Sequence, residues 1–247
     1  MQINMKKIIS LIFMAIVLAI NVQARTFVLC VGVSSYQNSD NNLSQTTKDA
    51  KQFKTVMENH TKDITILTSK YANKDNILEK MRAIGNRAQK GDKIILFFSG
   101  HGYPGGIVAH DKHLTYQEIN DILSKSSASA KICFVDACHA GSVGEVRDNS
   151  RSYKAPSSGN IIYMMSSRAN EYSIEHPWVG HGFFTQALLK GLRGKADANK
   201  DKKITVRELF NYVYNDVQHT TANMEVSQHP QLIGVKEVAE AVVVDWN

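Results

Sequence analysis

Residues 93–102, KIILFFSGHG, and residues 131–141, KICFVDACHAG, decide the fold of this 247-residue chain. Each is an apolar run followed by small and polar residues, which is typical of a strand buried on both faces of a parallel sheet. Ligands of such open sheets bind at the carboxyl ends of the strands. We therefore expect His101 and Cys138, which follow the two runs, to lie at one sheet edge. There, a thiol beside an imidazole supplies a nucleophile and its base.

The rest of the chain alternates strand and helix patterns, which predicts a parallel sheet with helices on both faces. Asn73 is a plausible N-cap, and the spacing of Thr115 and Glu118 is that of a capping box. No repeat or linker divides residues 25–247, so we expect one domain. Besides the two strands above, the pattern predicts strands at 27–33, 64–68, 161–165 and 241–244 and helices at 46–59, after Asn73, and at 114–123, 183–192 and 206–217.

The first residues have the pattern of an export signal. Lys6 and Lys7 precede the apolar run 8–20, and Val22-Gln23-Ala24 offers small residues for a signal peptidase. We predict a signal peptide at 1–24 and a periplasmic or secreted protein with no membrane attachment after cleavage. A membrane-anchoring helix is the alternative, but the run is short for a bilayer span.

Charge argues against a nucleic-acid partner. Residues 1–24 carry two lysines and no acid, so their removal lowers the formal net charge from +6 to +4. Acidic and basic residues are interspersed along the rest of the chain, without a stripe of aromatic and basic residues, which is typical of a solvated surface.

The chain has three cysteines, so at least one is unpaired. Cys30 and Cys133 lie inside apolar runs, where cysteine usually acts as a small hydrophobic residue. A disulfide between them is not expected, because the strand order would keep them apart. Cys138 has polar neighbours at a strand end, a setting that lowers a thiol pKa.

The paired motifs at 99–102 and 136–141 resemble those of the caspase-like cysteine peptidases, most closely the metacaspase and bacterial caspase-homologue branch. The resemblance includes residues 31–36, 109–116 and 182–188. It implies a three-layer α/β/α sandwich, with a mostly parallel six-stranded sheet and helices on both faces. It also implies that residues 25–247 form a single peptidase domain.

The resemblance makes Cys138 the nucleophile and His101 its partner, with the backbone N–H groups of Gly102 and Cys138 as oxyanion donors. An imidazole within reach of a thiol takes its proton and later protonates the leaving amine. His139 is a rival base, but adjacent residues project in different directions. A non-catalytic protein of the same fold that binds peptides or partners is the alternative function. Further rivals for the base, without a strand-end position, are His110, His113, His176 and His181.

Asp136 matches the acid that lines the first specificity pocket in metacaspases and their bacterial relatives. Ser173 and Glu175 are predicted to line the same pocket, near the place where caspases that cut after aspartate carry an arginine. A carboxylate there binds guanidinium or ammonium and repels acids, which predicts peptide or protein substrates cut after Arg or Lys. The alternatives are that Asp136 accepts backbone N–H bonds and that Glu175 is a solvated loop charge.

Residues 142–160 are rich in Gly, Ser and charged residues, which predicts a surface loop. Arg147, Arg151 and Lys154 lie within it. An enzyme that cuts after basic residues would therefore cleave itself there, and many family members are matured by cleavage in this region.

Residues 197–208 match an EF-hand-like calcium loop at Asp197, Asn199, Asp201 and Glu208. Lys202 departs from the pattern, because glycine normally occupies this sharp turn. Alternatively, Glu208 forms a capping box with Thr205 and the acids only solvate the loop. The peptidase hypothesis requires no cofactor, and calcium is left open. The sequence predicts no oligomeric state.

Overall fold

The computed structural model describes residues 24–137, 156, 158–168, 182–222, 224 and 228–247. A six-stranded sheet forms its centre, with strand order β10-β8-β7-β3-β1-β2. All neighbouring strands are parallel except β10, which runs antiparallel to β8. The strands are β1 (Thr26–Gly32), β2 (Ile64–Thr68), β3 (Lys93–Ser99), β7 (Ala130–Asp136), β8 (Ile161–Met165) and β10 (Gln231–Gly234).

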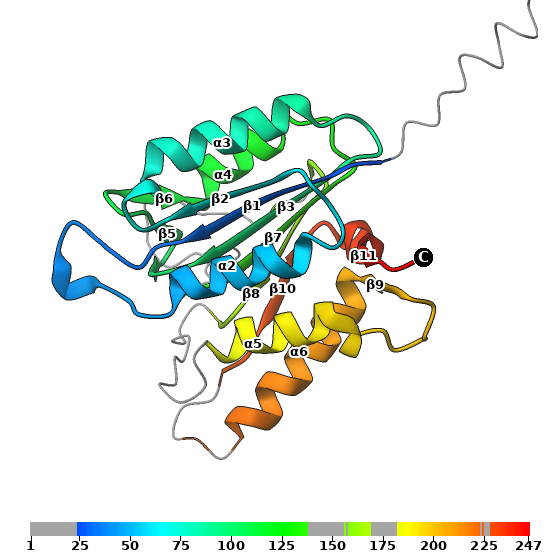
Figure 1. Cartoon of the computed structure of the whole chain (residues 1–247). Helices are drawn as coiled ribbons and strands as arrows, with labels where there is room; N and C mark the ends of the chain where they lie inside the picture. The colour runs from blue at the N-terminus through cyan, green and yellow to red at the C-terminus, as the bar shows by residue number, and fades with distance from the viewer. Residues whose placement is uncertain (1–23, 138–155, 157, 169–181, 223, 225–227) are drawn as a thin grey trace, which may run out of the picture.

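Helices cover both faces of the sheet (Figure 1). α3 (Lys74–Arg87) and α4 (Tyr116–Leu123) pack on one face, and α2 (Thr46–Met57), α5 (Phe183–Lys190) and α6 (Val206–Thr221) pack on the other. Alternate side chains of β1 enter two separate cores: Phe27 lies in one and Val28 in the other. Because both faces of the sheet are buried, its strands need continuous apolar runs. The predicted α/β/α sandwich is confirmed.

The sixth strand of the sheet differs from the prediction. Residues 241–244 were expected to complete the sheet, but β11 (Val242–Asp245) instead pairs with β9 (Lys203–Thr205) in a separate two-stranded sheet. The sixth strand is β10, a four-residue segment after Pro230 that the pattern did not indicate. Its pairing with β8 is a long-range contact, so local sequence carries almost no signal for it.

A three-stranded antiparallel sheet was also missed. It consists of β4 (Gly102–Tyr103), β5 (Gly106–Val108) and β6 (His113–Thr115). These strands are too short to show a period of two. They matter for the site because β4 begins directly after His101.

The predicted helix caps are confirmed. The Asn73 side chain accepts a hydrogen bond from the Asn76 N–H, and Thr115 forms a capping box with Glu118. The helix expected at 183–192 ends at Lys190 and continues as a π-helical turn, Gly191–Lys195. Gly194 in that turn has a φ of 108°, which suits glycine and ends the regular helix.

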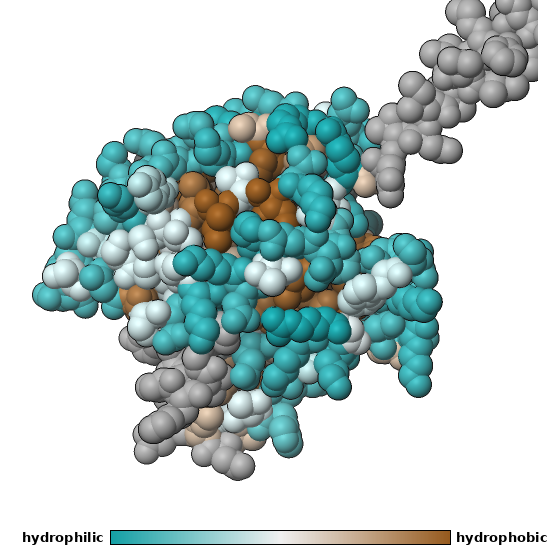
Figure 2. Space-filling model, viewed as in Figure 1, coloured by the Kyte–Doolittle hydropathy of each residue, from teal (hydrophilic) through white to brown (hydrophobic). Residues whose placement is uncertain are grey.

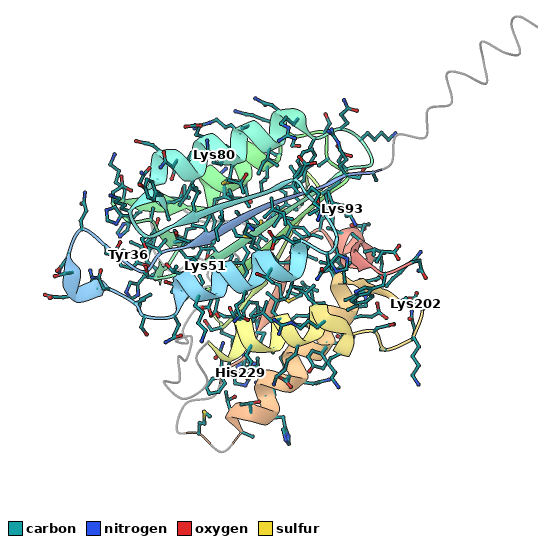
Figure 3. All side chains as sticks on the ribbon, viewed as in Figure 1. Tyr36, Lys51, Lys80, Lys93, Lys202 and His229 are labelled. Carbon is teal, nitrogen blue, oxygen red and sulfur yellow. The ribbon has the colours of Figure 1, made fainter. Side chains whose placement is uncertain are left out.

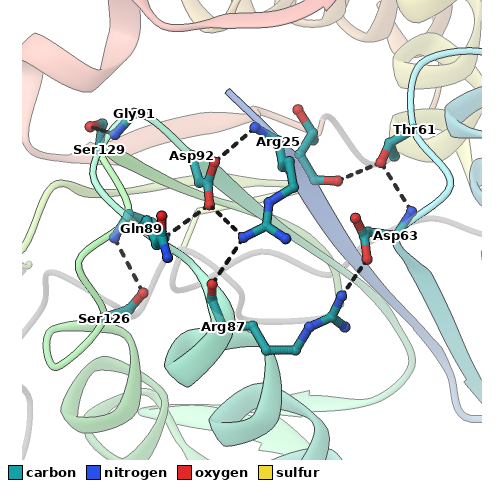
Figure 4. Close-up of polar contacts among 11 residues, drawn as sticks. Arg25, Thr61, Asp63, Arg87, Gln89, Gly91, Asp92, Ser126 and Ser129 are labelled. Atoms are coloured by element: carbon teal, nitrogen blue, oxygen red, sulfur yellow. Dashed lines mark hydrogen bonds and ion pairs between the residues drawn. The ribbon is translucent and has the colours of Figure 1, made fainter. Parts of the chain in front are cut away.

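At the amino ends of the strands, Asp92 ties the turn before β3 to the segment that enters β1 (Figure 4). Its carboxylate accepts bonds from the backbone N–H groups of Arg25 and Gln89 and lies 3.4 Å from the Arg25 guanidinium. This contact fixes the start of β3 against the segment that enters β1. The amino edge is therefore closed by structural contacts, and the carboxyl edge is left for the site.

The two cysteines of the described strands are free thiols, as predicted. Cys30 lies in the core beneath α2 and Cys133 in the core on the opposite face, with β3 between their strands. Within the described ranges, no helix combines the length and apolar character needed to cross a bilayer.

Candidate active site

The register of two neighbouring strands aligns the two motifs. Ser99, the last residue of β3, pairs with Asp136, the last residue of β7. One further backbone bond, from the Gly100 N–H to the Asp136 carbonyl oxygen at 3.1 Å, continues this ladder. His101 is two residues after Ser99, and Cys138 is two residues after Asp136. Cys138 itself lies outside the described residues, so the geometry below is that of its partners.

His101 is held from several sides at the carboxyl edge. Its backbone N–H donates to the Tyr36 hydroxyl at 2.8 Å, and the Tyr36 ring packs against the imidazole with centroids 4.9 Å apart. Its carbonyl accepts from the Val108 N–H at 2.9 Å. Figure 3 shows Tyr36 at this end of the sheet and Lys93 at the other. The loop after β1 and the β5 strand thus fix the His101 backbone.

A backbone carbonyl also sets the tautomer of His101. Nε2 of the imidazole lies 2.9 Å from the Asn41 carbonyl oxygen. A carbonyl oxygen only accepts, so Nε2 carries the hydrogen and donates it. In the neutral ring Nδ1 is then the acceptor nitrogen, the state that a general base needs.

Gly100 allows this close packing. A Cβ added there would lie 2.7 Å from the Phe98 ring and 3.0 Å from the Tyr36 hydroxyl oxygen. Any side chain at position 100 would therefore force the Phe98 ring to shift and would crowd the Tyr36 hydroxyl that holds His101. Gly102, the predicted oxyanion donor, is the first residue of β4 and pairs with Ile107.

Asp136 is buried at 6% exposure, and its carboxylate meets the start of α5. Oδ2 accepts from the Thr185 backbone N–H at 3.2 Å and from the Thr185 hydroxyl at 2.7 Å. A Cβ on Gly182, the N-cap of α5, would lie 2.7 Å from Oδ2. Asp136 thus caps a helix that has no side-chain cap of its own, a role set out above as the alternative to substrate binding.

A second buried carboxylate lies beside it. Asp49, on α2, is 1% exposed and accepts a 2.8 Å bond from the Ser99 hydroxyl. Because Ser99 pairs with Asp136, the two carboxylates reach the same edge on the face covered by α2 and α5. One turn before Asp49, the buried Thr46 hydroxyl has no hydrogen-bond partner in the described part of the chain.

The comparisons with known proteins identify the family of this chain. A family profile described as the caspase domain, a group of peptidases, matches residues 25–238. This chain belongs to the caspase-domain family.

Individual relatives are distant from this caspase domain. A protein described as a probable protease, from a Desulfuromonadales bacterium, is 23% identical over 85% of this chain and 32% of its own length. The chain therefore spans about a third of that relative. A crystal structure of a Geobacter sulfurreducens protein matches with a TM-score of 0.64 at 16% identity, covering 88% of this chain and 97% of that one. Caspase-1 from Spodoptera frugiperda matches with a TM-score of 0.62 at 16% identity, covering 86% and 87%.

Several predicted residues of the caspase domain lie outside the described ranges: Cys138, Arg147, Arg151, Lys154, Ser173 and Glu175, and the rival bases His139, His176 and His181. Two rivals are described. Nδ1 of His110 lies 2.7 Å from the Ser35 carbonyl oxygen, and the His113 ring stacks on Tyr103 with centroids 4.4 Å apart. Both rings support the hairpin next to His101.

The loop at 197–208 forms a tight turn closed by its own side chains. The Asp201 N–H donates to Asn199 Oδ1, and the Lys202 N–H donates to Asp197 Oδ2. Lys202 has a φ of 64°, the left-handed conformation that glycine adopts at this place in a calcium loop. Glu208 Oε2 accepts from the Thr205 backbone and hydroxyl in a capping box. Among described residues no cluster of three or more acidic, histidine or cysteine side chains has metal-binding geometry.

Three contributors to the site were not predicted from the sequence. Asn41 acts through its backbone carbonyl, which no residue pattern can reveal. The Tyr36 hydroxyl acts across 65 positions of sequence. Asp49 could have been found from the sequence, because it is an acid on the apolar face of a predicted helix, beside Ala50 and Phe53. Acids are rarely buried there without a partner or a function.

Proposed function

We propose that this caspase domain is an exported cysteine endopeptidase that cuts after Arg or Lys, with His101 as base and Cys138 as nucleophile. The supporting observation is the His101 imidazole, whose Nε2 donates to the Asn41 carbonyl and leaves Nδ1 as the acceptor. The strand before His101 is in register with the strand before Cys138, because Ser99 pairs with Asp136. Export rests on the signal pattern at 1–24.

The proposed chemistry uses one imidazole for every proton transfer. Nδ1 of His101 takes the Cys138 proton, and the thiolate attacks the peptide carbonyl carbon to form a C–S bond. The Gly102 and Cys138 N–H groups stabilise the oxyanion. When the C–N bond breaks, the imidazolium protonates the leaving amine. Water then hydrolyses the thioester by the same path, and its proton returns through His101 to the thiolate.

Charge at the sheet edge supports the specificity. The carboxylates of Asp49 and Asp136 flank Ser99 on the α2/α5 face and place two acidic groups at this edge. A guanidinium or ammonium entering there gains charge-assisted bonds, and an acidic side chain is repelled. Ser173 and Glu175 belong to this proposed pocket.

Fluorogenic peptides that differ only in the residue before the scissile bond test this proposal. We expect Arg and Lys peptides to be cleaved at least about 100-fold faster than the Asp peptide, which corresponds to about 3 kcal/mol. Cys138→Ala should abolish cleavage and labelling by an arginyl acyloxymethyl ketone. A preference for Asp, or turnover that survives Cys138→Ala, would refute the proposal. The same variant tests self-cleavage after Arg147, Arg151 or Lys154. If the enzyme cleaves itself there, the Cys138→Ala protein should stay intact.

A further inference from the structure

One serine side chain holds both backbone groups of the residue before the proposed nucleophile. The Ser166 hydroxyl accepts from the Ala137 N–H at 3.1 Å and donates to the Ala137 carbonyl oxygen at 3.0 Å. Ser166 is fully buried, and Ala137 is 1% exposed. The neighbouring Ser167 hydroxyl is 3.5 Å from the same carbonyl oxygen, at the limit of a hydrogen bond. Water does not compete for these bonds.

Ser166 takes over where the sheet ladder stops. Its own N–H donates to the Val135 carbonyl at 2.9 Å, the last backbone rung between β8 and β7. β8 ends at Met165, one residue before β7 ends at Asp136, and beyond that point the side chain of Ser166 replaces the backbone partner that β8 no longer provides. Chain direction at Ala137 is therefore set by a hydroxyl and not by strand pairing.

Control of the Ala137 carbonyl has a chemical consequence. A peptide unit is planar, and in its trans form the C=O and the following N–H point in opposite directions. The unit that contains the Ala137 carbonyl also contains the Cys138 N–H, the proposed oxyanion donor. A bond that fixes the Ala137 carbonyl therefore constrains the orientation of this peptide unit.

A second layer holds Ser166 in turn. Nε2 of Gln228, fully buried, donates to the Ser166 carbonyl at 2.8 Å. The backbone carbonyl of Gln228 accepts a bond from Nε2 of Gln218, on α6, at 2.6 Å. In Figure 3, His229 marks where this segment lies, near the start of α5. Ala137 is therefore linked through Ser166 and Gln228 to α6.

We propose that Ser166 is a positioning residue for catalysis, which aims the Cys138 N–H and thiol by clamping Ala137, and that Gln228 holds Ser166 in place. The inference rests on the proposed peptidase function. It differs from a purely structural role, in which Ser166 would only end the sheet.

Steady-state kinetics on an arginyl peptide separate the two roles. We expect Ser166→Ala to lower kcat by about 10- to 100-fold, because small misplacements of reacting groups cost that much, with KM within about twofold. Ser166→Thr keeps the hydroxyl and should stay within about tenfold of wild type. Ser126→Ala is the matched control, since Ser126 is also buried and accepts a backbone N–H bond, from Ala128. Equal kcat values for Ser166→Ala and Ser126→Ala would overturn the inference.

Thiol alkylation gives a readout that does not need turnover. Burial raises the pKa of Cys30 to about 12 and also raises the pKa of Cys133, so at neutral pH iodoacetamide should react at Cys138. We expect Ser166→Ala to slow this alkylation and to move its pH midpoint upward, as the thiol loses its alignment with His101. Unchanged rate and midpoint would overturn the inference even if wild type cleaves no peptide. Peptide cleavage failing in wild type would refute the proposed function alone.

A milder variant covers the case in which Ser166→Ala does not fold. Gln228→Met keeps the shape of the side chain but removes the bond to the Ser166 carbonyl. Circular dichroism should show a folded protein with a kcat about three- to tenfold below wild type, and Cys138 alkylation should slow in parallel. A folded Gln228→Met protein with wild-type kcat and alkylation rate would contradict the proposed second layer.

Discussion

At the scale of single residues, the candidate site depends on groups that hold His101 in one orientation. Its N–H, its carbonyl and Nε2 each have a partner from a different segment of the chain. Such fixed geometry matters because catalysis falls steeply with small displacements of the reacting groups. The partners are a phenol and two backbone groups, and the phenol is the one that a side-chain truncation removes without altering the backbone.

Tyr36→Phe removes the acceptor of the His101 N–H but keeps the ring against the imidazole. We expect kcat on an arginyl peptide to fall about tenfold, because the half-buried His101 N–H loses its partner and the loop can shift. Tyr71→Phe, at a tyrosine that is 62% exposed, should leave kcat unchanged. A kcat for Tyr36→Phe equal to that of the control would show that this bond does not position His101.

Asp92 should make stability depend on pH. Burial by itself raises the pKa of Asp92, but bonds from the Gln89 and Arg25 N–H groups and the Arg25 charge outweigh it and hold the pKa below its usual range. A carboxyl whose pKa is lower in the folded state stabilises the protein above its unfolded pKa of about 3.9, and loses this effect as pH falls through the folded pKa.

Urea denaturation of Asp92→Asn checks this prediction. At pH 7 the variant should be about 2 kcal/mol less stable than wild type, and the difference should shrink as the pH falls below about 4. Asp40→Asn, at an exposed position, should match wild type throughout. A constant difference between Asp92→Asn and wild type from pH 7 to pH 3 would contradict the role of its charge.

At the scale of elements, caps and short turns decide where helices begin. The Thr205 and Glu208 capping box starts α6 directly after β9, and the turn at 197–202 is closed by bonds to its own carboxylates. The same residues that suggest calcium therefore also satisfy the backbone without it. A variant of the capping residue can therefore separate the calcium site from the capping box.

Glu208→Ala removes the side chain that caps the Thr205 N–H. We expect the free energy of unfolding to fall by about 1 kcal/mol in EDTA, because the cap is lost whether or not calcium binds. The calcium hypothesis predicts a further rise in melting temperature of wild type, but not of the variant, when calcium replaces EDTA. Calorimetry that detects no heat with wild type would remove calcium from the proposal.

At the scale of the whole molecule, the sheet divides two cores and leaves its two edge strands, β2 and β10, half-buried. Figure 2 shows apolar side chains over β2, where Ile64 and Ile66 are only half-buried beside α2. The opposite edge strand is β10, which pairs with β8 and is half-buried along its length. β11 pairs with β9, and its Val243 and Val244 lie in the core on the α2 face. The C-terminal residues therefore belong to the core of the domain.

Truncation after residue 240 tests that conclusion. It removes Val243 and Val244, which are 2% and 1% exposed, and unpairs β9. Burying a valine contributes about 2 kcal/mol, so we expect the free energy of unfolding to drop by about 4 kcal/mol in urea titrations. The substitution Trp246→Ala, at a side chain 40% exposed, should cost less than about 1 kcal/mol. A truncated protein as stable as wild type would show that β11 is dispensable.

The local sequence pattern was enough to predict those features of the fold whose physical cause lies within one strand or one helical turn. Unbroken apolar runs predicted β3 and β7, because strands buried on both faces require them, and the caps at Asn73 and Thr115 follow from bonds within one helical turn. The placement of His101 and Cys138 after two such strands followed from the same runs.

Only the tertiary structure decided what joins distant segments. In the folded chain β10, and not residues 241–244, is the sixth strand. Nε2 of His101 donates to the Asn41 carbonyl, and the Ser166 hydroxyl contacts Ala137. The physical reason is common to all three. Each depends on contacts between segments far apart along the chain, and two of them use backbone groups that every residue carries, so no residue pattern can specify them in advance.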